Sequence, residues 1–351
     1  MKKYIINGIF ITHTITGVER LGYNILKYLD LICSDLNIEL LIPNRAKCEL
    51  KYKNIKIVRY GNKNGVLWVQ FDYSKYVKKN KGTILGLGTY MPFFLKGGIV
   101  YLHDIRDIVM SDFAKFKYRL MSYLSCYFRC YWSDHIITVS EFSKSEILKN
   151  YKIKKNKISV IYNGWQHIEE NNSIFNNEKF PFLKEKDYYF FLGSIAKHKN
   201  IKWIIEIAKN NPKQTFAISG KKIDRLFDDK IDNKCPNNVH FLGYLNDNDI
   251  IVFMKYCKAF VFPSLYEGFG IPPLEALSLG AKVIVSDIQV HKEIYGSTVY
   301  YINPYVYDIN IDELINSKVE SPASILEKYD FYKSAKELYD ILKVNNKIFD
   351  N

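Results

Sequence analysis

Two glutamates, Glu267 and Glu275, lie on either side of a Gly-Phe-Gly turn and a Pro-Pro pair in FPSLYEGFGIPPLEAL, residues 262–277. Pro272 and Pro273 suit the first turn of a helix, where their missing N–H groups cost little. Glycines let backbone amides approach a ligand, and a helix start carries partial positive charge. The stretch therefore predicts a phosphate site between two carboxylates that accept hydrogen bonds from hydroxyls, as a diphosphate with a sugar at each end requires. A capped surface helix with two solvated glutamates is the alternative that the spacing leaves open.

Short apolar runs rich in Ile, Val, Tyr and Phe predict the strands that must position this site. In the first half of the chain these runs lie at 4–11, 38–43, 66–71, 99–103, 135–139 and 158–162. In the second half they lie at 188–195, 215–220, 239–245, 259–264 and 281–287. Segments of helical period lie between several of them, at 18–31 and 113–131 among others. Because continuous apolar strands alternate with helices, we predict an α/β fold of two doubly wound, Rossmann-like parallel sheets that face each other across a cleft. The glutamate stretch then follows the strand 259–264 at its carboxyl end, where such sheets bind ligands.

The amino-acid composition limits which kinds of protein the chain can be. The chain has 351 residues, 48% hydrophobic and 25% charged, which is enough for two globular cores. No segment approaches the roughly 18 to 20 apolar residues of a membrane span, and the start reads as a strand of a cytoplasmic protein. The six cysteines have no metal-type spacing, and we expect them to be buried free thiols.

The net charge of +13 is concentrated in the first half, where residues 1–165 carry 27 Lys and Arg against 12 Asp and Glu. Such an excess suggests an anionic partner, which could be nucleic acid, a phospholipid surface or a phosphorylated acceptor. A general Lys-rich and Asn-rich composition is the alternative. No nucleic-acid-binding module is evident in the sequence, so we expect no nucleic acid as a partner.

The stretch EGFGIPPLE, residues 267–275, resembles the E-x7-E motif of retaining glycosyltransferases with the GT-B fold, of family four in particular. The resemblance implies that Glu267 contacts the hydroxyls of a donor sugar and that Glu275 contacts the ribose of a nucleotide. It also implies that the loop residues between them lie near the diphosphate and the sugar; these are Gly268, Phe269 and Gly270.

A second segment, LGSIAKHKNIKWIIEIAK at 192–209, resembles the part of the family's donor domain where basic residues grip the diphosphate. The resemblance assigns this role to Lys199. Many members carry Arg where this chain has Ser194, and one variant of the motif has Arg where this chain has His198, so neither arginine of the family's motif is present here. A departing diphosphate needs a fixed cation or a metal. We expect Lys199 to serve, with no metal and no other cofactor.

Two segments of the first half match the family more weakly. HTITGVERLGYNIL, residues 13–26, resembles the glycine loop that begins the family's first helix, and implies that Gly17 approaches the donor phosphate or the acceptor and that Arg20 contacts an anionic group. VYLHDIRD places His103 at a strand end, and the family's histidine there faces the donor sugar. An ordinary glycine turn and a buried structural histidine are the alternatives.

The predicted domains follow from these matches. We expect an acceptor-side Rossmann-like domain at 1–165, a linker at 166–187 and a nucleotide-sugar-binding Rossmann-like domain at 188–325. The helical end, 326–351, is expected to pack back on the first domain, as it does in the family the chain resembles.

The predicted function is transfer of a hexose or deoxyhexose, of mannosyl or rhamnosyl type, from a nucleotide-diphosphate sugar to a glycan or polyprenyl-diphosphate-linked acceptor with retention. The resemblance places this reaction in synthesis of a bacterial surface polysaccharide such as O-antigen, lipopolysaccharide or capsule. The alternatives are a nucleotide-sugar epimerase or phosphorylase of the same fold class, a nonenzymatic nucleic-acid or anion-binding protein, and a degenerate sugar-binding subunit.

The segment 113–132, FAKFKYRLMSYLSCYFRCYW, combines cations with aromatic residues and contains no acidic residue. Its cations are Lys115, Lys117, Arg119 and Arg129. An interfacial helix has this composition, so we predict peripheral docking on an anionic membrane surface, at the inner face of the cell membrane. A partly buried domain helix, with its aromatics in the core and its cations in water, is the alternative.

Overall fold

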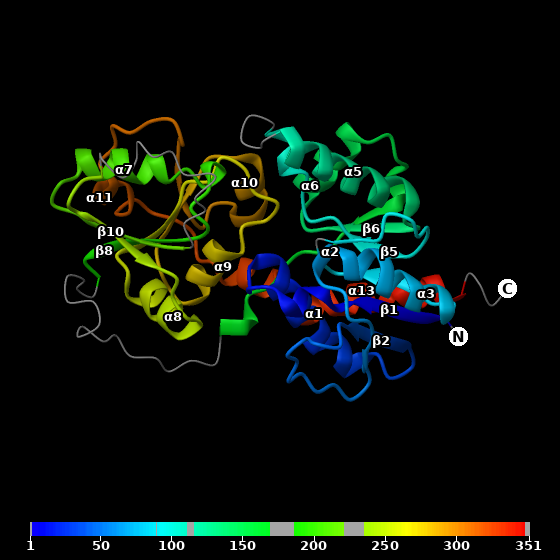
Figure 1. The fold of residues 1–351 in the computed structure, drawn as a ribbon. Coiled ribbons are helices and arrows are strands. Elements are labelled where there is room, and N and C mark those ends of the chain that lie inside the picture. Colours follow the sequence, from blue (N-terminus) through cyan, green and yellow to red (C-terminus); the bar gives the residue numbers. More distant parts are fainter. Residues whose placement is uncertain (1, 89, 111–115, 169–185, 221–234, 348–351) are drawn as a thin grey trace. The chain divides into compact units, whose positions relative to one another are not determined.

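The computed structural model describes residues 2–88, 90–110, 116–168, 186–220 and 235–347. The chain forms two compact units (Figure 1). The first unit comprises residues 1–164 and 329–351, and the second unit comprises residues 165–328. Among the described residues, no helix is both long and apolar enough to cross a bilayer.

The first unit is built on a sheet of seven parallel strands in the order β3-β2-β1-β4-β5-β6-β7. Its strands are β1 (Lys3–Asn7), β2 (Asn37–Ile42), β3 (Lys56–Arg59), β4 (Thr83–Gly86), β5 (Ile99–Tyr101), β6 (His135–Thr138) and β7 (Ile158–Val160). Central β1 pairs with β2 on one side and with β4 on the other. The strand order therefore reverses between β1 and β4, which is the position where doubly wound sheets bind ligands.

Helices connect these strands. They are η1 (Gly8–Thr12), α1 (Gly17–Ile32), α2 (Gly65–Leu67), η2 (Trp68–Tyr73), α3 (Ser74–Lys79), α4 (Arg106–Val109), α5 (Phe116–Trp132), α6 (Glu141–Asn150), η4 (Lys155–Lys157) and α13 (Phe331–Lys347). The last of them, α13, packs against α1. Tyr4 Oη of β1 donates to the Leu342 carbonyl at 2.8 Å, and Ser334 Oγ donates to the Tyr162 carbonyl at 2.6 Å. These bonds make the C-terminal helix part of the first unit.

The apolar run 66–71 is helical, so the strand predicted there is wrong. Trp68 and Tyr73 are fully buried, whereas Leu67 is 59% and Phe71 is 57% exposed. One-sided burial of this kind belongs to a helix that covers a sheet. A short apolar run cannot be assigned to strand or helix from periodicity alone, which is why the sequence misled here. The sequence also did not predict β3, β4 or β13, which are only three or four residues long.

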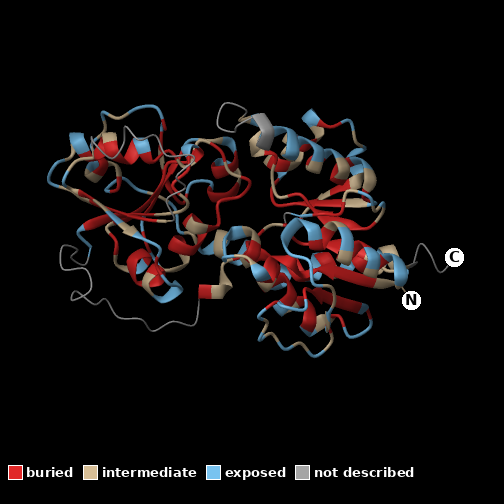
Figure 2. Cartoon of the chain, viewed as in Figure 1, coloured by how far each residue is buried: buried red, intermediate tan, exposed pale blue. Residues whose placement is uncertain are grey.

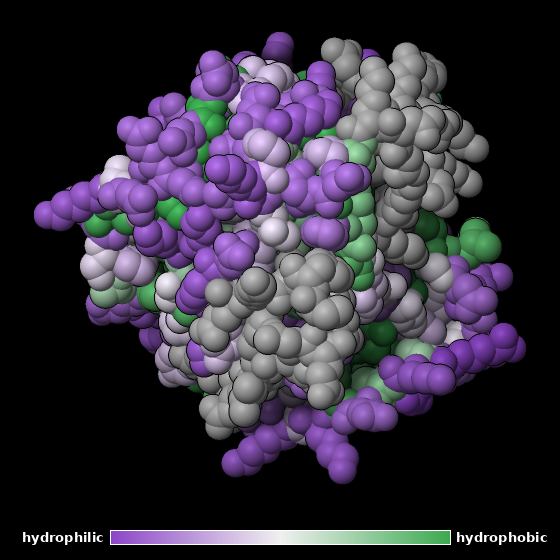
Figure 3. Space-filling model, turned by 90° about the vertical axis from the view of Figure 1, so that its left-hand side faces the viewer, coloured by the Kyte–Doolittle hydropathy of each residue, from purple (hydrophilic) through white to green (hydrophobic). Residues whose placement is uncertain are grey.

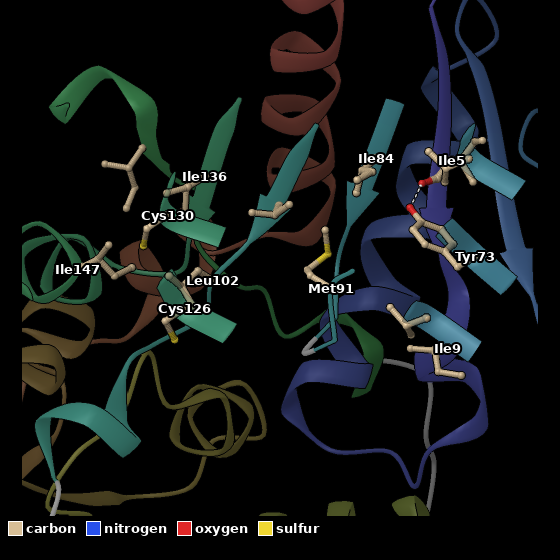
Figure 4. Close-up of a cluster of buried hydrophobic side chains, with 14 of the residues drawn as sticks. Ile5, Ile9, Tyr73, Ile84, Met91, Leu102, Cys126, Cys130, Ile136 and Ile147 are labelled. Atoms are coloured by element: carbon tan, nitrogen blue, oxygen red, sulfur yellow. Dashed lines mark hydrogen bonds between the residues drawn. The ribbon is translucent and has the colours of Figure 1, made fainter. Parts of the chain in front are cut away.

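The core of the first unit lies between its sheet and the covering helices (Figure 4). Ile5, Ile84 and Ile136 reach it from the strands, and Cys126 and Cys130 reach it from α5. All six cysteines are free, and Cys33, Cys126, Cys130 and Cys257 are buried as expected. Cys48 and Cys235 are only half-buried, so the expected burial is wrong for these two.

The second unit is built on a sheet of six parallel strands in the order β10-β9-β8-β11-β12-β13. Its strands are β8 (Tyr188–Leu192), β9 (Thr215–Ser219), β10 (Val239–Gly243), β11 (Ala259–Phe262), β12 (Val283–Ser286) and β13 (Tyr300–Ile302). Its helices are η5 (Gln166–Ile168), η6 (Lys197–Lys199), α7 (Ile201–Asn210), α8 (Asp247–Tyr256), α9 (Ile271–Ser278), α10 (Gln289–Tyr295), α11 (Ile311–Leu314) and α12 (Ala323–Lys328). Every residue of β11 and β12 is buried, and exposed residues lie on the outer surfaces of the helices (Figure 2). The two parallel sheets confirm the predicted fold class.

Candidate functional site

The strand order of the second unit reverses between β8 and β11, which pair through Tyr189 and Ala259. The loops that follow these two strands therefore emerge side by side at the carboxyl edge of the sheet. A backbone hydrogen bond joins the loops, because Leu265 N donates to the His198 carbonyl at 2.7 Å. The segment that carries Glu267 and the segment that carries Lys199 thus form one site.

Lys199 and Glu267 form an ion pair across these loops. Lys199 Nζ lies 2.7 Å from Glu267 Oε1, and their side chains are 14% and 13% exposed. The same Nζ lies 4.6 Å from the centre of the Phe262 ring at the end of β11, which is within cation–π range. Asn200, in the left-handed conformation at φ 55°, ends the short helix η6 and starts α7, so the turn fixes where Lys199 points. The pair is charge-assisted and mostly shielded from water.

The pKa of Glu267 is lower than its ordinary value. Burial by itself raises this pKa, but the charges of Lys199 and His198 and the hydrogen bond from Lys199 outweigh burial. Glu267 is therefore an ionised carboxylate at neutral pH. An ionised carboxylate is a strong acceptor for donor groups such as sugar hydroxyls.

Glu275 is also buried, at 3% exposure, because it lies on the inner side of α9. Pro272 and Pro273 occupy the first turn of this helix, as the sequence predicts. His167 Nε2 lies 2.7 Å from Glu275 Oε1. The alternative of a surface helix with two solvated glutamates is therefore wrong, since Glu275 is buried, the Glu267 side chain is only 13% exposed, and both carboxylates are paired.

The glycine turn between the glutamates is shaped by contacts from α10. Gly270 has φ 91°, in the left-handed region, and Tyr295 Oη donates to its carbonyl. Phe269 is 3% exposed, so its ring is part of the core. His291 is fully buried, and its Nδ1 lies 2.9 Å from the Ser286 carbonyl. Burial lowers the pKa of His291 to about 4, so a neutral imidazole packs under the turn.

The loop after β8 holds the remaining predicted residue of the second unit. Gly193 N donates to the Ser219 carbonyl at 3.0 Å, which ties the loop to β9. Ser194 is half-buried in this loop, and its carbonyl accepts from Ala196 N at 2.9 Å. His198 is 8% exposed and close enough to Glu267 for its charge to lower that residue's pKa.

His103 and Gly17 lie in the first unit. His103 follows β5, and its Nε2 lies 3.1 Å from the Leu87 carbonyl, so Nε2 carries the proton and Nδ1 is the acceptor. Its own carbonyl accepts from Thr138 Oγ1 at 3.3 Å. Burial lowers the pKa of His103 below its ordinary value. Gly17 is exposed at the first position of α1, after Thr16, whose backbone N–H donates to the Glu19 carboxylate at 3.1 Å.

The structure thus brings Lys199, Ser194, the glycine turn and both glutamates together in the second unit, and it places His103 and Gly17 in the first. The sequence did not identify His167 or His291. His167 lies in the predicted linker, 108 positions from its partner Glu275, and no local pattern points to it. His291 sits in an ordinary amphipathic helix, where a single histidine carries no signal.

The expectation of metal independence rested partly on the absence of an Asp-x-Asp triplet of the metal-dependent type, but the chain does contain an Asp-x-Asp triplet, Asp247-Asn248-Asp249. The triplet begins α8, where Asn246 Oδ1 accepts from Asp249 N at 2.9 Å. These acidic residues thus stabilise a helix start, where negative charge is favoured. Within the described ranges, no group of three His, Cys, Asp or Glu side chains is arranged to hold a metal ion.

Comparison with solved structures identifies the fold. The chain superposes on Anabaena Alr3699/HepE in complex with UDP-glucose with a TM-score of 0.68 over 98% of this chain and 100% of that one, at 16% identity. It superposes on WaaG, a glycosyltransferase involved in lipopolysaccharide biosynthesis, with a TM-score of 0.65 over 97% and 95%, at 14% identity. The two doubly wound units are those of the GT-B class.

Sequence comparison identifies the family. The family described as Glycosyltransferase Family 4 matches residues 49–166, and the family described as Glycosyl transferases group 1 matches residues 172–337. The chain belongs to these glycosyltransferases. It is 33% identical to O-antigen chain mannosyltransferase RfbU of Salmonella typhimurium over 60% of this chain and 58% of that protein. It is 26% identical to O-antigen chain mannosyltransferase B of Escherichia coli over 68% and 64%. The chain thus spans less than two thirds of either relative.

Proposed function

We propose that the chain is a retaining hexosyltransferase that moves a mannosyl- or rhamnosyl-type sugar from a nucleotide-diphosphate donor to a glycan or polyprenyl-diphosphate-linked glycan acceptor. The reaction belongs to bacterial surface polysaccharide synthesis, of the O-antigen, lipopolysaccharide or capsule kind. The observation that carries the proposal is the largely shielded Lys199–Glu267 pair, together with buried Glu275, at the strand-order reversal of the second unit. The names of the mannosyltransferase relatives support the choice of sugar.

Each of the three side chains has a part in donor binding. Lys199 supplies the cation for the diphosphate, whose negative charge grows as the sugar departs. Glu267, kept ionised, holds hydroxyls of the donor sugar. Glu275, oriented by His167, holds the ribose. When the diphosphate attracts the Lys199 ammonium, Glu267 becomes available to accept hydrogen bonds from the sugar hydroxyls. The same movement of Lys199 therefore helps to bind both the diphosphate and the sugar of the donor.

The proposed chemistry is a displacement on one face of the sugar ring, through an oxocarbenium-like transition state. The leaving phosphate accepts the proton of the attacking acceptor hydroxyl, and the new glycosidic bond keeps the anomeric configuration. Lys199 is assigned to stabilise the negative charge of the leaving phosphate, so the proposal needs no metal and no other cofactor. In the first unit, His103 is assigned to the donor sugar and Gly17 to the phosphate or acceptor side.

A transfer assay tests the proposal. The purified chain is incubated with GDP-mannose, dTDP-rhamnose or UDP-glucose and a polyprenyl-diphosphate-linked glycan, and the anomeric configuration of the product is read by NMR. We expect one donor to be used, with retention. Glu267→Gln should lower kcat, whereas Glu206→Gln, in an exposed pair with Lys209 on α7, should not. Release of a free epimer or a sugar phosphate without acceptor would instead identify an epimerase or a phosphorylase.

The site of action is proposed to be the surface of an anionic membrane, through α5. Six large apolar side chains of this helix are between 39% and 48% exposed: Leu120, Met121, Tyr123, Leu124, Tyr127 and Tyr131. Four of them, at 120, 124, 127 and 131, are three or four positions apart and share one face. Where the face that includes α7 and α11 is drawn in colour, hydrophilic residues cover much of it (Figure 3). The predicted alternative, in which the aromatics of α5 lie in the core, does not fit these tyrosines.

Cations lie beside this exposed face. Tyr151 stacks with Tyr123 at 6.0 Å between ring centres, and the exposed lysine triplet that follows it is Lys152, Lys154 and Lys155. Lys157 Nζ donates to the Tyr131 carbonyl at 3.3 Å, which joins the same segment to the end of α5. Of the cations expected from the sequence, Lys115 lies outside the described residues, as does the side chain of Lys117. Arg119 is exposed. Arg129 is buried, so its assignment to the membrane-facing surface is wrong.

Vesicle binding tests this part of the proposal. Each Lys near an anionic surface contributes about 1 kcal/mol, so changing the lysine triplet to Gln should weaken binding to anionic vesicles roughly 100-fold. The matched control changes three exposed lysines of the second unit to Gln: Lys202, Lys209 and Lys213. Equal binding to neutral and anionic vesicles, or equal losses in the two triple variants, would contradict docking through α5.

A further inference from the structure

Arg129 of α5 is a buried arginine that has no ion-pair partner among the residues that the structure describes. The residue is 6% exposed, and its Nε is buried with no hydrogen-bond acceptor among the described residues. Cys126 and Cys130, which lie three positions before and one position after it on α5, point into the core beside Leu102 (Figure 4). Arg129 therefore lies on the inner side of the helix.

A guanidinium in such a place is costly unless an anion compensates its charge. Burial lowers the pKa of Arg129 below its ordinary value, but arginine remains protonated in proteins. Buried charges in native proteins are paired or hydrogen-bonded, and each exception calls for an explanation. Among its described residues, the chain supplies no carboxylate to this group.

The surroundings of Arg129 point to the substrate. Its charge reaches His103, where burial lowers the pKa of the imidazole and the charge of Arg129 lowers it further. His103 follows β5 at the carboxyl edge of the sheet, the edge that binds ligands in this fold. The carboxylates that follow His103 in the chain already have hydrogen-bond or ion-pair partners. Asp104 Oδ1 accepts from Arg106 N at 3.0 Å, and Asp107 pairs with the Arg106 guanidinium at 3.0 Å.

We propose that Arg129 binds a phosphate group of a substrate in the first unit. The inference rests on the proposed function, since both the donor and a polyprenyl-diphosphate acceptor carry such a group. The planar guanidinium matches two phosphate oxygens at once, and a partly desolvated site strengthens that contact. The burial of an unpaired charge in the free chain is then the preorganisation of a binding site, which the anion stabilises.

Thermal unfolding and calorimetry with inorganic pyrophosphate test the inference on the full chain. Arg129→Met removes the charge and keeps most of the apolar stem. Without ligand, its Tm should equal or exceed that of the wild type, because replacing an uncompensated buried charge by an apolar side chain is neutral or stabilising. Its affinity for pyrophosphate should fall about tenfold or more, the usual loss of a hydrogen bond to a charged group. Arg129→Lys should recover part of the affinity, and Arg119→Met, an exposed arginine on the same helix, should change neither quantity.

Parallel titrations with UDP and GDP distinguish the two sources of the phosphate. If Arg129→Met also weakens binding of a nucleoside diphosphate, the donor supplies the group. If only pyrophosphate binding falls, the acceptor supplies it. Unchanged pyrophosphate affinity in Arg129→Met overturns the proposal, as does a Tm drop in the ligand-free variant, which would make Arg129 a structural residue. These measurements need no turnover, so a chain that binds pyrophosphate through Arg129 and transfers no sugar would refute the proposed function alone.

Discussion

The Lys199–Glu267 pair should contribute far more to stability than a surface pair of the same length. Lys199→Met leaves Glu267, 13% exposed, without its ion-pair partner, and loss of one partner of a buried pair costs about 3–5 kcal/mol in the free energy of unfolding. The pair Lys209–Glu206 has nearly the same distance, 2.8 Å, but its side chains are 36% and 32% exposed. Solvent screening limits such a pair to about 0–1 kcal/mol. Lys209→Met is therefore the matched control, and burial is the main difference between the two perturbations.

Urea unfolding measures the effect, with hydrogen exchange of β8 and β11 to assign the transition to the second unit. Adding Glu267→Gln to Lys199→Met should restore part of the lost stability, because the neutral amide removes the buried charge. The two single changes should thus be non-additive by about 1–3 kcal/mol, as expected for residues in direct contact. A loss in Lys199→Met no larger than in Lys209→Met, or additive single changes, would refute the assignment of a strong buried pair.

The pH dependence supplies an independent check of the same pair. The folded-state pKa of Glu267 is lowered from its ordinary 4.5, so its stabilisation is fully present above that value and is lost as pH falls through the lowered pKa. The stability difference between wild type and Glu267→Gln should therefore be constant at neutral pH and shrink only on strong acidification. A difference that disappears already near neutral pH would mean that the pKa of Glu267 is raised.

Three further predictions follow from the site. Glu275→Ala should weaken binding of the correct free nucleoside diphosphate by about 1–3 kcal/mol in calorimetry, because a buried acceptor for ribose hydroxyls is lost; binding as tight as in Glu206→Ala would contradict the ribose assignment. Gly270→Ala should lower the free energy of unfolding by more than Gly280→Ala does. Both glycines have positive φ, at 91° and 75°. A Cβ at Gly270 would lie 3.2 Å from Tyr295 Oη, whereas one at Gly280 would meet nothing within 4 Å. Equal losses would show that the Tyr295 side chain moves aside at no cost in stability. Transfer activity should persist in EDTA. If EDTA abolishes activity and added Mg²⁺ restores it, a metal stabilises the charge of the leaving diphosphate in place of Lys199.

Much of the fold could be predicted from the sequence because parallel sheets covered on both faces need continuous apolar strands. Runs such as 259–264 and 281–287 contain strands that are wholly buried in the structure. The glutamate pair was also visible, since the two glycines, the two prolines and the strand before them constrain one local strand-turn-helix unit. Burial of Glu275 was not visible, because His167, which pairs with it, comes from a segment more than a hundred positions away.

The sequence by itself determined the alternation of strand and helix, the turn that carries Glu267 and the helix that carries Glu275, because these depend on neighbours a few residues apart. Only the tertiary structure decided which face of each helix is buried. In α5, apolar side chains occur on every side, so periodicity assigns no inner face. Packing against the sheet buries Cys126, Arg129 and Cys130 and leaves Leu124 and Tyr127 exposed. The ion pair between Lys199 and Glu267 is likewise a tertiary feature, since the reversal of strand order at β8 and β11 brings together loops that are 68 positions apart in the chain.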